Sequence, residues 1–351
     1  MPKSLIKHDI TMGCASFVLE QRCFNLLAEK NSCSFLSETE LKINKNILRE
    51  LRNYLDIDFI LYPIIAKLKP EKFLQIIDGY NPGLPYAKNA RSDYSFEQIE
   101  RLQKPCNIVS LGAGFDCKWI NAFLYDPESN RLWHRLSLSD KFEVYLVDNS
   151  HDQNKVFAKA LKKIFGKLPE NVNFRERDLS KKGWSANLLK DESQPVIFQS
   201  NGLLPYYTEK QIDNILSEAL SVKSCMMLTA TLDIESQKAK DIASQSHARK
   251  KQETQGKQSE TQLHSYENIE ELEEFIKGFA EKFSNKLNRL IDHKINFNAE
   301  ELVEKGQILC QKYPPSKLSD AYKDNNVIPG GEAIISFSIT SVKTIKDLQV
   351  Y

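Results

Sequence analysis

The segment from Val109 to Asp116 (VSLGAGFD) is the part of the sequence best suited to hold a ligand. It combines an apolar run, predicted as a strand, with a glycine turn that opens a helix. Gly112 and Gly114 let the backbone approach a ligand closely, and the N–H groups of a helix start favour its polar end. Cys117 stands where a dinucleotide fingerprint has its third glycine, so the turn favours S-adenosylmethionine (SAM) over NAD. The predicted cofactor site contains Gly112, Ala113, Gly114 and Asp116.

Two further aspartates follow later predicted strands. Asp148 ends the next apolar run, where a carboxylate can accept both ribose hydroxyls. The fingerprint expects this carboxylate about 20 residues after the glycines, and a loop insertion at Tyr125 to Lys141 explains the longer spacing. Asp178 could accept from the adenine amino group, and Leu179 could line the base. Each aspartate alone could be a helix cap or turn residue, but their position behind the glycine turn favours a SAM site.

The elements that carry these residues alternate between short apolar runs and helical patterns, which is typical of an α/β fold with a parallel sheet. One helix is predicted from Gln153 to Phe165, and another after Thr208, whose side chain can form a capping box with Gln211. The predicted strands are Ile108 to Leu111, Glu143 to Asp148, Val172 to Arg175, Val196 to Gln199 and Met226 to Asp233.

The organisation along the chain predicts a Rossmann-like core with helical additions. The expected parts are an N-terminal helical cap at 1–105, the SAM-binding core at 106–234, a helical insertion or substrate lid at 235–324, and a C-terminal strand segment at 325–351 that completes the core sheet. Glu235 to Ser265 is polar and is expected to be a solvated helix or mobile insertion, or else a lid. A helical pattern then runs from Ile269 to Leu290, a second helix is predicted from Ala299, and a strand from Glu332 to Val342.

Composition narrows the classes of function. The chain has 351 residues and a formal net charge of +1, which gives no overall field for nucleic acid or an anionic membrane. No apolar stretch approaches the roughly 20 residues of a membrane span, and the N-terminus lacks the pattern of a signal peptide. The seven cysteines form no C-x-x-C pair and the histidines are scattered, so neither a disulfide framework nor a metal site is expected. These features favour a cytoplasmic protein.

The sequence resembles the leucine carboxyl methyltransferase family, which consists of class I SAM-dependent methyltransferases. The resemblance rests on five motifs and covers roughly Tyr80 to Leu220. These motifs are Ala90-Arg91, LGAGFD (Leu111 to Asp116), Val147-Asp148, Asp178-Leu179 and NGLLPYY (Asn201 to Tyr207).

The resemblance implies roles for individual residues. Arg91 would bind the cofactor carboxylate, the two glycines would pass under its methionine part, Asp148 would take the ribose, and Asp178 with Leu179 the adenine. Asn201 would lie near the ammonium and sulfonium of the cofactor, where family members commonly carry glutamate. Arg91, Tyr206 and Tyr207 are the candidates for orienting the methyl acceptor.

The predicted activity is methyl transfer from SAM to a carboxylate or other oxygen of a small molecule or a protein C-terminus. A carboxylate nucleophile is ionised at neutral pH and needs only orientation, whereas a hydroxyl would need a general base. His151 lies closest to Asp148 in the sequence, although a surface position at a helix start also explains it. The alternative is a methyltransferase fold that has lost turnover and acts as an interaction protein, which Asn201 favours and the intact LGAGFD opposes.

Overall fold

The structure is a computed structural model of the 351-residue chain. It describes residues 44–47, 49–50, 90–91, 94–95, 98, 105–116, 142–168, 170–234, 264–297, 301, 304–305 and 331–340. The strands are β1 (Cys106–Leu111), β2 (Phe142–Asp148), β3 (Val172–Glu176), β4 (Val196–Ser200), β5 (Cys225–Ile234), β6 (Leu290–Phe297) and β7 (Gly331–Thr340). The helices are α7 (His151–Phe165), the short 3-10 helix η4 (Leu204–Tyr206), α8 (Glu209–Ser221) and α10 (Ile269–Leu287).

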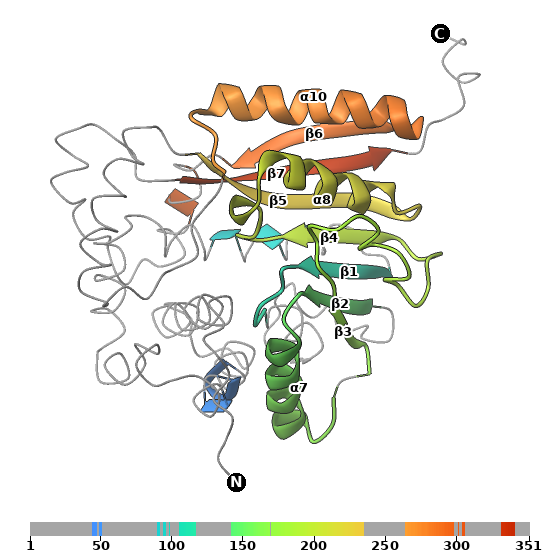
Figure 1. The fold of residues 1–351 in the computed structure, drawn as a ribbon, viewed down its shortest axis with the longest axis vertical. Helices are drawn as coiled ribbons and strands as arrows, with labels where there is room; N and C mark the ends of the chain where they lie inside the picture. The colour runs from blue at the N-terminus through green and yellow to red at the C-terminus, as the bar shows by residue number, and fades with distance from the viewer. Residues whose placement is uncertain are drawn as a thin grey trace, which may run out of the picture.

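These strands form one seven-stranded sheet in the order β3-β2-β1-β4-β5-β7-β6. Neighbours among the first five strands pair in parallel, and β7 runs antiparallel to both β5 and β6. In Figure 1 the arrowheads of β1, β2 and β4 therefore point one way and that of β7 the other. The predicted Rossmann-like α/β fold is confirmed, and the strand order reverses between β1 and β4.

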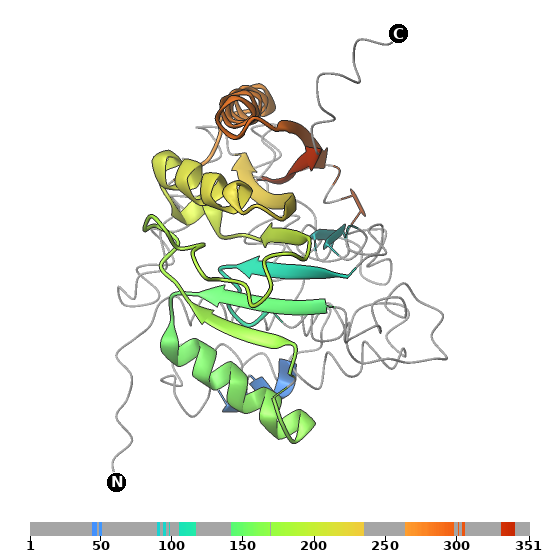
Figure 2. The ribbon, with the colours of Figure 1, turned by 90° about the vertical axis from the view of Figure 1, so that its right-hand side faces the viewer.

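Helices cover both faces of this sheet. Val147 of β2 belongs to the buried cluster that also contains residues of α8 and α10. On the other face, Leu146 stands in register with Phe174 of β3, and the Phe174 ring packs edge to face on Phe157 of α7 at 5.6 Å. Figure 2 shows α8 and α10 side by side near β5 and β6, with α7 at the opposite end beside β3.

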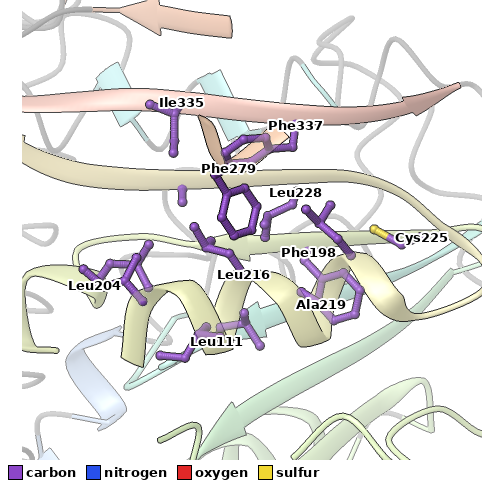
Figure 3. Close-up of a cluster of buried hydrophobic side chains, with 14 of the residues drawn as sticks. Leu111, Phe198, Leu204, Leu216, Ala219, Cys225, Leu228, Phe279, Ile335 and Phe337 are labelled. Carbon is purple, nitrogen blue, oxygen red and sulfur yellow. The ribbon is translucent and has the colours of Figure 1, made fainter. Parts of the chain in front are cut away.

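The main core lies between the sheet and the helices α8 and α10 (Figure 3). Apolar residues recur on one face of each helix, and their burial against strands that are apolar on both faces provides the main driving force for folding. Phe279 of α10 lies 5.1 Å from Phe337 of β7, measured between ring centroids, and 4.6 Å from Phe283 one turn along the helix. Packing in this core thus holds β6 and β7 against the parallel part of the sheet.

Most of the predicted elements are present, and one strand was missed. The five predicted parallel strands are found with ends shifted by at most two residues, and Thr208 and Gln211 form the predicted capping box at α8. The prediction of helix up to Leu290 was wrong, because α10 ends at Leu287 and Leu290 begins β6. The segment predicted as a helical insertion therefore contributes an edge strand to the core sheet.

The strand predicted from Glu332 to Val342 is found as β7, which lies beside that edge, between β5 and β6. Of the predicted N-terminal helices, residues 44–47 and 49–50 are helical, and Ile47 is fully buried. The polar stretch from 235 to 263 and the predicted helix from Ala299, apart from Glu301, Glu304 and Lys305, lie outside the described residues. The domain limits remain predictions.

Candidate functional site

The carboxyl ends of β1, β2 and β4 lie side by side at the point where the strand order reverses. In register, Leu111 of β1 stands between Val147 of β2 and Ser200 of β4. The glycine turn, Asp148 and Asn201 each follow directly from these strands. Ligands of open α/β sheets bind at this edge, outside the carboxyl ends of the strands at the switch point. The described residues thus place most of the predicted site on one edge.

Two hydrogen bonds that backbone N–H groups of the glycine turn donate hold it against the end of β2. The N–H of Ala113 donates to the carbonyl of Val147 at 3.0 Å, and the N–H of Gly114 donates to Oδ2 of Asp148 at 3.0 Å. Gly112 and Gly114 have φ values of +59° and +53°, which L side chains rarely adopt. The turn therefore needs glycine for its own backbone conformation.

A neighbouring side chain further restricts Gly112. A Cβ at this position would lie 2.9 Å from Cγ of Leu203 and closer still to both methyl carbons of that leucine. The first obstacle to a side chain at Gly112 is therefore Leu203. Leu203 follows β4, so the two strand ends at the switch point meet through this contact.

Asp148 is the buried carboxylate of the site. It is 5% exposed, its Oδ2 accepts from Gly114 and its Oδ1 accepts from the N–H of Ser150 at 3.1 Å. Burial raises its pKa above the ordinary value of 3.8, while the hydrogen bonds from the backbone N–H groups of Gly114 and Ser150 oppose that rise. A carboxylate offers about four acceptor positions, so these two backbone bonds leave capacity for ribose hydroxyls. The residue therefore fits its predicted role.

Asp178 and Leu179 lie just beyond β3, next to the end of β2. The N–H of Arg177 donates to the carbonyl of Asp148 at 2.9 Å, which places the two strand ends together. Asp178 is half exposed, and its Oδ1 accepts from both the N–H and the hydroxyl of Ser180. Leu179 is buried in the main core cluster. Asp178 thus lies near Asp148, while Leu179 has a packing role; their contacts with adenine remain predictions.

Arg91 reaches the same edge from the face of the sheet opposite α8 and α10. Ala90 and Tyr94 pack on Ile334 of β7 and position the short helical piece that carries Arg91. The Nη1 atom of Arg91 donates to Oε2 of Glu332 at 2.7 Å, and both side chains are about nine-tenths buried. The same nitrogen lies 3.0 Å from the position of a Cβ at Gly202. Arg91 is therefore packed against the backbone that leaves β4.

Asn201 joins this group through Ser95. Its Nδ2 lies 3.5 Å from Oγ of Ser95, and that hydroxyl donates to the carbonyl of Arg91 at 3.0 Å. The buried Gln199 donates from Nε2 to the carbonyl of Ser95 at 3.3 Å. Polar groups at the end of β4 and just after it therefore anchor the helical piece that carries Arg91, a connection that the sequence did not reveal.

The tyrosines of NGLLPYY lie beyond these contacts, in and just after η4. Pro205 at the start of η4 is buried, whereas Tyr206 and Tyr207 are partly buried. Tyr207 packs against the main core cluster. Part of the Tyr207 side chain therefore serves packing. That the hydroxyls of Tyr206 and Tyr207 orient an acceptor remains a prediction.

The structure places His151 on the surface at the start of α7 and His264 beside Pro205. His151 begins α7 with a side chain 72% exposed, and its Nδ1 lies 2.9 Å from Oε2 of Glu176. This is the surface position at a helix start that the sequence allowed. His264 instead donates its backbone N–H to the carbonyl of Pro205 at 3.2 Å, and its ring packs edge to face on Tyr266 at 4.7 Å.

His264 and Tyr266 were not predicted as site residues. The Nε2 of His264 and the hydroxyl of Tyr266 are both buried without a hydrogen-bond partner, and burial raises the Tyr266 pKa far above its ordinary value. The phenol therefore keeps its proton. No local motif marks these residues, because only the folding of the segment before α10 brings them to Pro205.

Neither a metal site nor a membrane-spanning helix is found in the described part of the chain. Among these residues, no three His, Cys, Asp or Glu side chains gather in a way that could hold a metal ion. None of the described helices has the length and apolar character that a membrane crossing requires.

Comparison with known proteins agrees with this geometry. Residues 89–220 match the model of the leucine carboxyl methyltransferase family, so the resemblance seen in the sequence is confirmed over that part of the chain. A search of curated proteins found no relative. The family match over these residues and the sheet topology support a SAM-dependent methyltransferase with SAM as its cofactor.

The solved structures that match resemble the fold only loosely. The small RNA methyltransferase HEN1 is 12% identical with a TM-score of 0.40, covering 72% of this chain and 26% of its own. The protein of the duf574 family from Streptomyces avermitilis is 12% identical with a TM-score of 0.41, over 91% and 96% of the two chains. Geranyl diphosphate C-methyltransferase from Streptomyces coelicolor, solved with S-adenosyl-L-homocysteine, is 10% identical with a TM-score of 0.41, over 73% and 81%. The present chain thus spans about a quarter of the first of these proteins.

Proposed function

We propose that this SAM-dependent methyltransferase transfers its methyl group to an oxygen atom, and that the acceptor is a carboxylate or another oxygen of a small molecule or of a protein C-terminus. The observation that carries this proposal is the arrangement of the glycine turn, Asp148 and Arg91 around one edge of the sheet. Asp148 and the turn suit the nucleoside, and Arg91 supplies a buried cation nearby.

The residues present fit the cofactor. The backbone at Gly112 and Gly114 turns with positive φ, Asp148 has acceptor capacity for the ribose, and Asp178 stands next along the edge. SAM supplies an electrophilic methyl group on sulfur, and an in-line displacement asks mainly for alignment and exclusion of water. The protein therefore needs to orient the acceptor oxygen, and Arg91, Tyr206 and Tyr207 are the candidates for this task.

The positions of the histidines bear on the choice of oxygen. A hydroxyl acceptor needs a base within hydrogen-bond reach. His151 is exposed and paired with Glu176, which makes it a poor candidate for that base. A carboxylate acceptor needs no base, because its reference pKa near 4 leaves it ionised at neutral pH. If the acceptor is a hydroxyl, His264 beside Pro205 is the better candidate for the base.

A label-transfer experiment tests the proposal. The protein is incubated with SAM labelled in its methyl group and with a fractionated extract of its source cells, and the labelled product is treated with base. Release of volatile label indicates a methyl ester, and a base-stable product on oxygen indicates an ether. A carboxylate acceptor should show little rate dependence above about pH 6, whereas a hydroxyl served by histidine should show a rise near the histidine pKa.

The Asp148→Asn variant serves as the control for cofactor-dependent labelling. A product methylated on nitrogen or carbon would contradict the oxygen assignment. Binding of S-adenosylhomocysteine without any methylated product would favour the interaction protein with a degenerate site, for which the comparisons give no support.

A further inference from the structure

The ion pair between Arg91 and Glu332 joins two residues that are 241 positions apart in the chain. The exposed fractions of the two side chains are only 8% and 11%. Removing two charges from water is costly, and a buried ion pair is often no more stabilising than apolar residues of the same size. Stability alone therefore gives little reason for this pair.

The pair lies at the ligand-binding edge of the sheet. Glu332 stands in register with Asp233 near the carboxyl end of β5, because β7 runs antiparallel and begins there. Nη1 of Arg91 donates to Glu332 and lies 3.0 Å from the position that a Cβ at Gly202 would occupy. Gly202 follows β4, next to the glycine turn. A cation and an anion are thus held together beside the exit of β4.

The charges of the cofactor match this arrangement. The methionine part of SAM ends in a carboxylate and an ammonium group on one carbon. Asn201, the side chain that precedes Gly202, carries no charge, and Asp148 is engaged with the glycine turn on the β2 side. Glu332, whose side chain is 11% exposed, is therefore the carboxylate that pairs with Arg91 at this edge.

We propose that Arg91 and Glu332 act together as a clamp for the amino-acid end of the cofactor, in which Glu332 accepts from the ammonium while Arg91 donates to the carboxylate. The inference rests on SAM as the cofactor of the proposed function. One mutual hydrogen bond leaves both partners with free capacity, since a guanidinium has five N–H donors and a carboxylate about four acceptor positions. The Arg91–Glu332 clamp thus adds Glu332 to the cofactor-binding residues.

Four nucleoside ligands separate this role from a structural one. S-adenosylhomocysteine carries both charged groups, S-adenosyl-3-thiopropylamine keeps only the ammonium, S-(3-carboxypropyl)-5′-thioadenosine keeps only the carboxylate, and 5′-methylthioadenosine has neither. Calorimetry measures their affinities for the wild type and for Glu332→Gln, which keeps the shape of the side chain. The variant should lose roughly tenfold to a hundredfold for the two ligands with an ammonium, as expected for a charge-assisted bond. The affinities for the other two should change less than about twofold.

A matched control removes a pair that lies on the surface. Glu176→Gln breaks the exposed contact with His151 and should leave all four affinities unchanged. Equal losses for all four ligands in Glu332→Gln would show a structural role and overturn the proposal. A loss confined to the ligands with a carboxylate would also overturn it, since Glu332 would then only position Arg91.

The wild type provides a test that needs no variant. The thiopropylamine ligand should bind the wild-type protein at least about tenfold more tightly than methylthioadenosine, and equal affinities would contradict the clamp even if Glu332→Gln failed to fold. A wild-type protein that bound none of the four ligands would instead refute SAM as the cofactor. The failure of the inference and the failure of the proposed function are therefore distinguishable.

Discussion

Gly112 illustrates how single residues build the cofactor edge. Its backbone has a positive φ, and Leu203 fills the space where a side chain would start. Two separate penalties therefore oppose any substitution at this position. One comes from the backbone conformation and the other from the contact between the ends of β1 and β4.

We expect Gly112→Ala to destabilise the protein by more than the roughly 1–2 kcal/mol that a left-handed conformation costs an L-residue. Gly183→Ala is the matched control, because Gly183 has φ +79° and nothing within 4 Å of a Cβ. Denaturant unfolding measures both variants. Adding Leu203→Ala to Gly112→Ala should recover part of the difference, and equal losses in the two glycine variants would contradict a role for Leu203.

Asp148 should make the affinity for S-adenosylhomocysteine depend on pH. The ionised carboxylate is the better acceptor for ribose hydroxyls, and burial raises its pKa above 3.8. As the pH falls, protonation should therefore weaken binding at a higher pH than for an exposed aspartate. Asp148→Asn should cost about 1.5–3 kcal/mol at neutral pH and remove this pH dependence.

Calorimetry across a pH series checks this prediction. Asp191→Asn is the control, since Asp191 lies before β4 at the opposite edge and hydrogen bonds from Ser193 lower its pKa. The wild-type pH dependence should persist in this control variant. An unchanged pH dependence in Asp148→Asn would assign the titration to another group.

At the scale of elements, α10 connects the parallel strands to the last two strands. Its apolar side faces the sheet, and Phe279 is packed between Phe283 of the same helix and Phe337 of β7. The strand β7 carries Glu332 at its start. Packing of α10 therefore also supports the strand that delivers one half of the Arg91–Glu332 clamp.

Phe279→Ala should lower the free energy of unfolding by about 3–5 kcal/mol, because it removes a buried ring and leaves a cavity. Phe275→Ala is the matched control on the same helix. The Phe275 ring is only partly buried, so its loss should cost less. Urea unfolding with a common slope for the variants gives the comparison, and a cost below about 1 kcal/mol for Phe279→Ala would contradict the packing argument.

At the scale of the whole molecule, the sheet joins distant parts of the chain. Cys106 in β1 and Cys225 in β5 lie on either side of β4 and are both buried. Burial raises the pKa of each thiol to about 12. Because the thiolate is the reactive form, neither side chain should react while the sheet is intact.

Alkylation should therefore report on global unfolding. Iodoacetamide at mildly alkaline pH should leave Cys106 and Cys225 unmodified in native buffer and modify both over the same range of denaturant. Peptide mass spectrometry distinguishes the two positions, and the fully denatured protein supplies the control for complete labelling. Modification of either cysteine at denaturant concentrations that leave the other protected would show that β1 and β5 open independently.

The sequence by itself determined the local features of this protein. The strand, glycine turn and following acidic residues are defined by neighbours in the chain, as is the capping box of Thr208 and Gln211. Short apolar runs specified the parallel strands, because a strand buried on both faces must be apolar throughout. These patterns sufficed to predict the Rossmann-like core, SAM as the cofactor and the position of Asp148.

Only the tertiary structure decided the features that depend on distant residues. The strand β6 escaped prediction because it is an edge strand with exposed polar side chains such as His293 and Lys294, and apolar residues before it continued a helical pattern. Asn288 adopts a left-handed conformation at the end of α10. Because asparagine is common at such helix ends, it was the local signal that could have indicated where the helix stops. The pairing of Arg91 with Glu332 follows no sequence spacing at all. It arises because β7 inserts antiparallel beside β5, and long-range strand pairing depends on packing that no local pattern encodes.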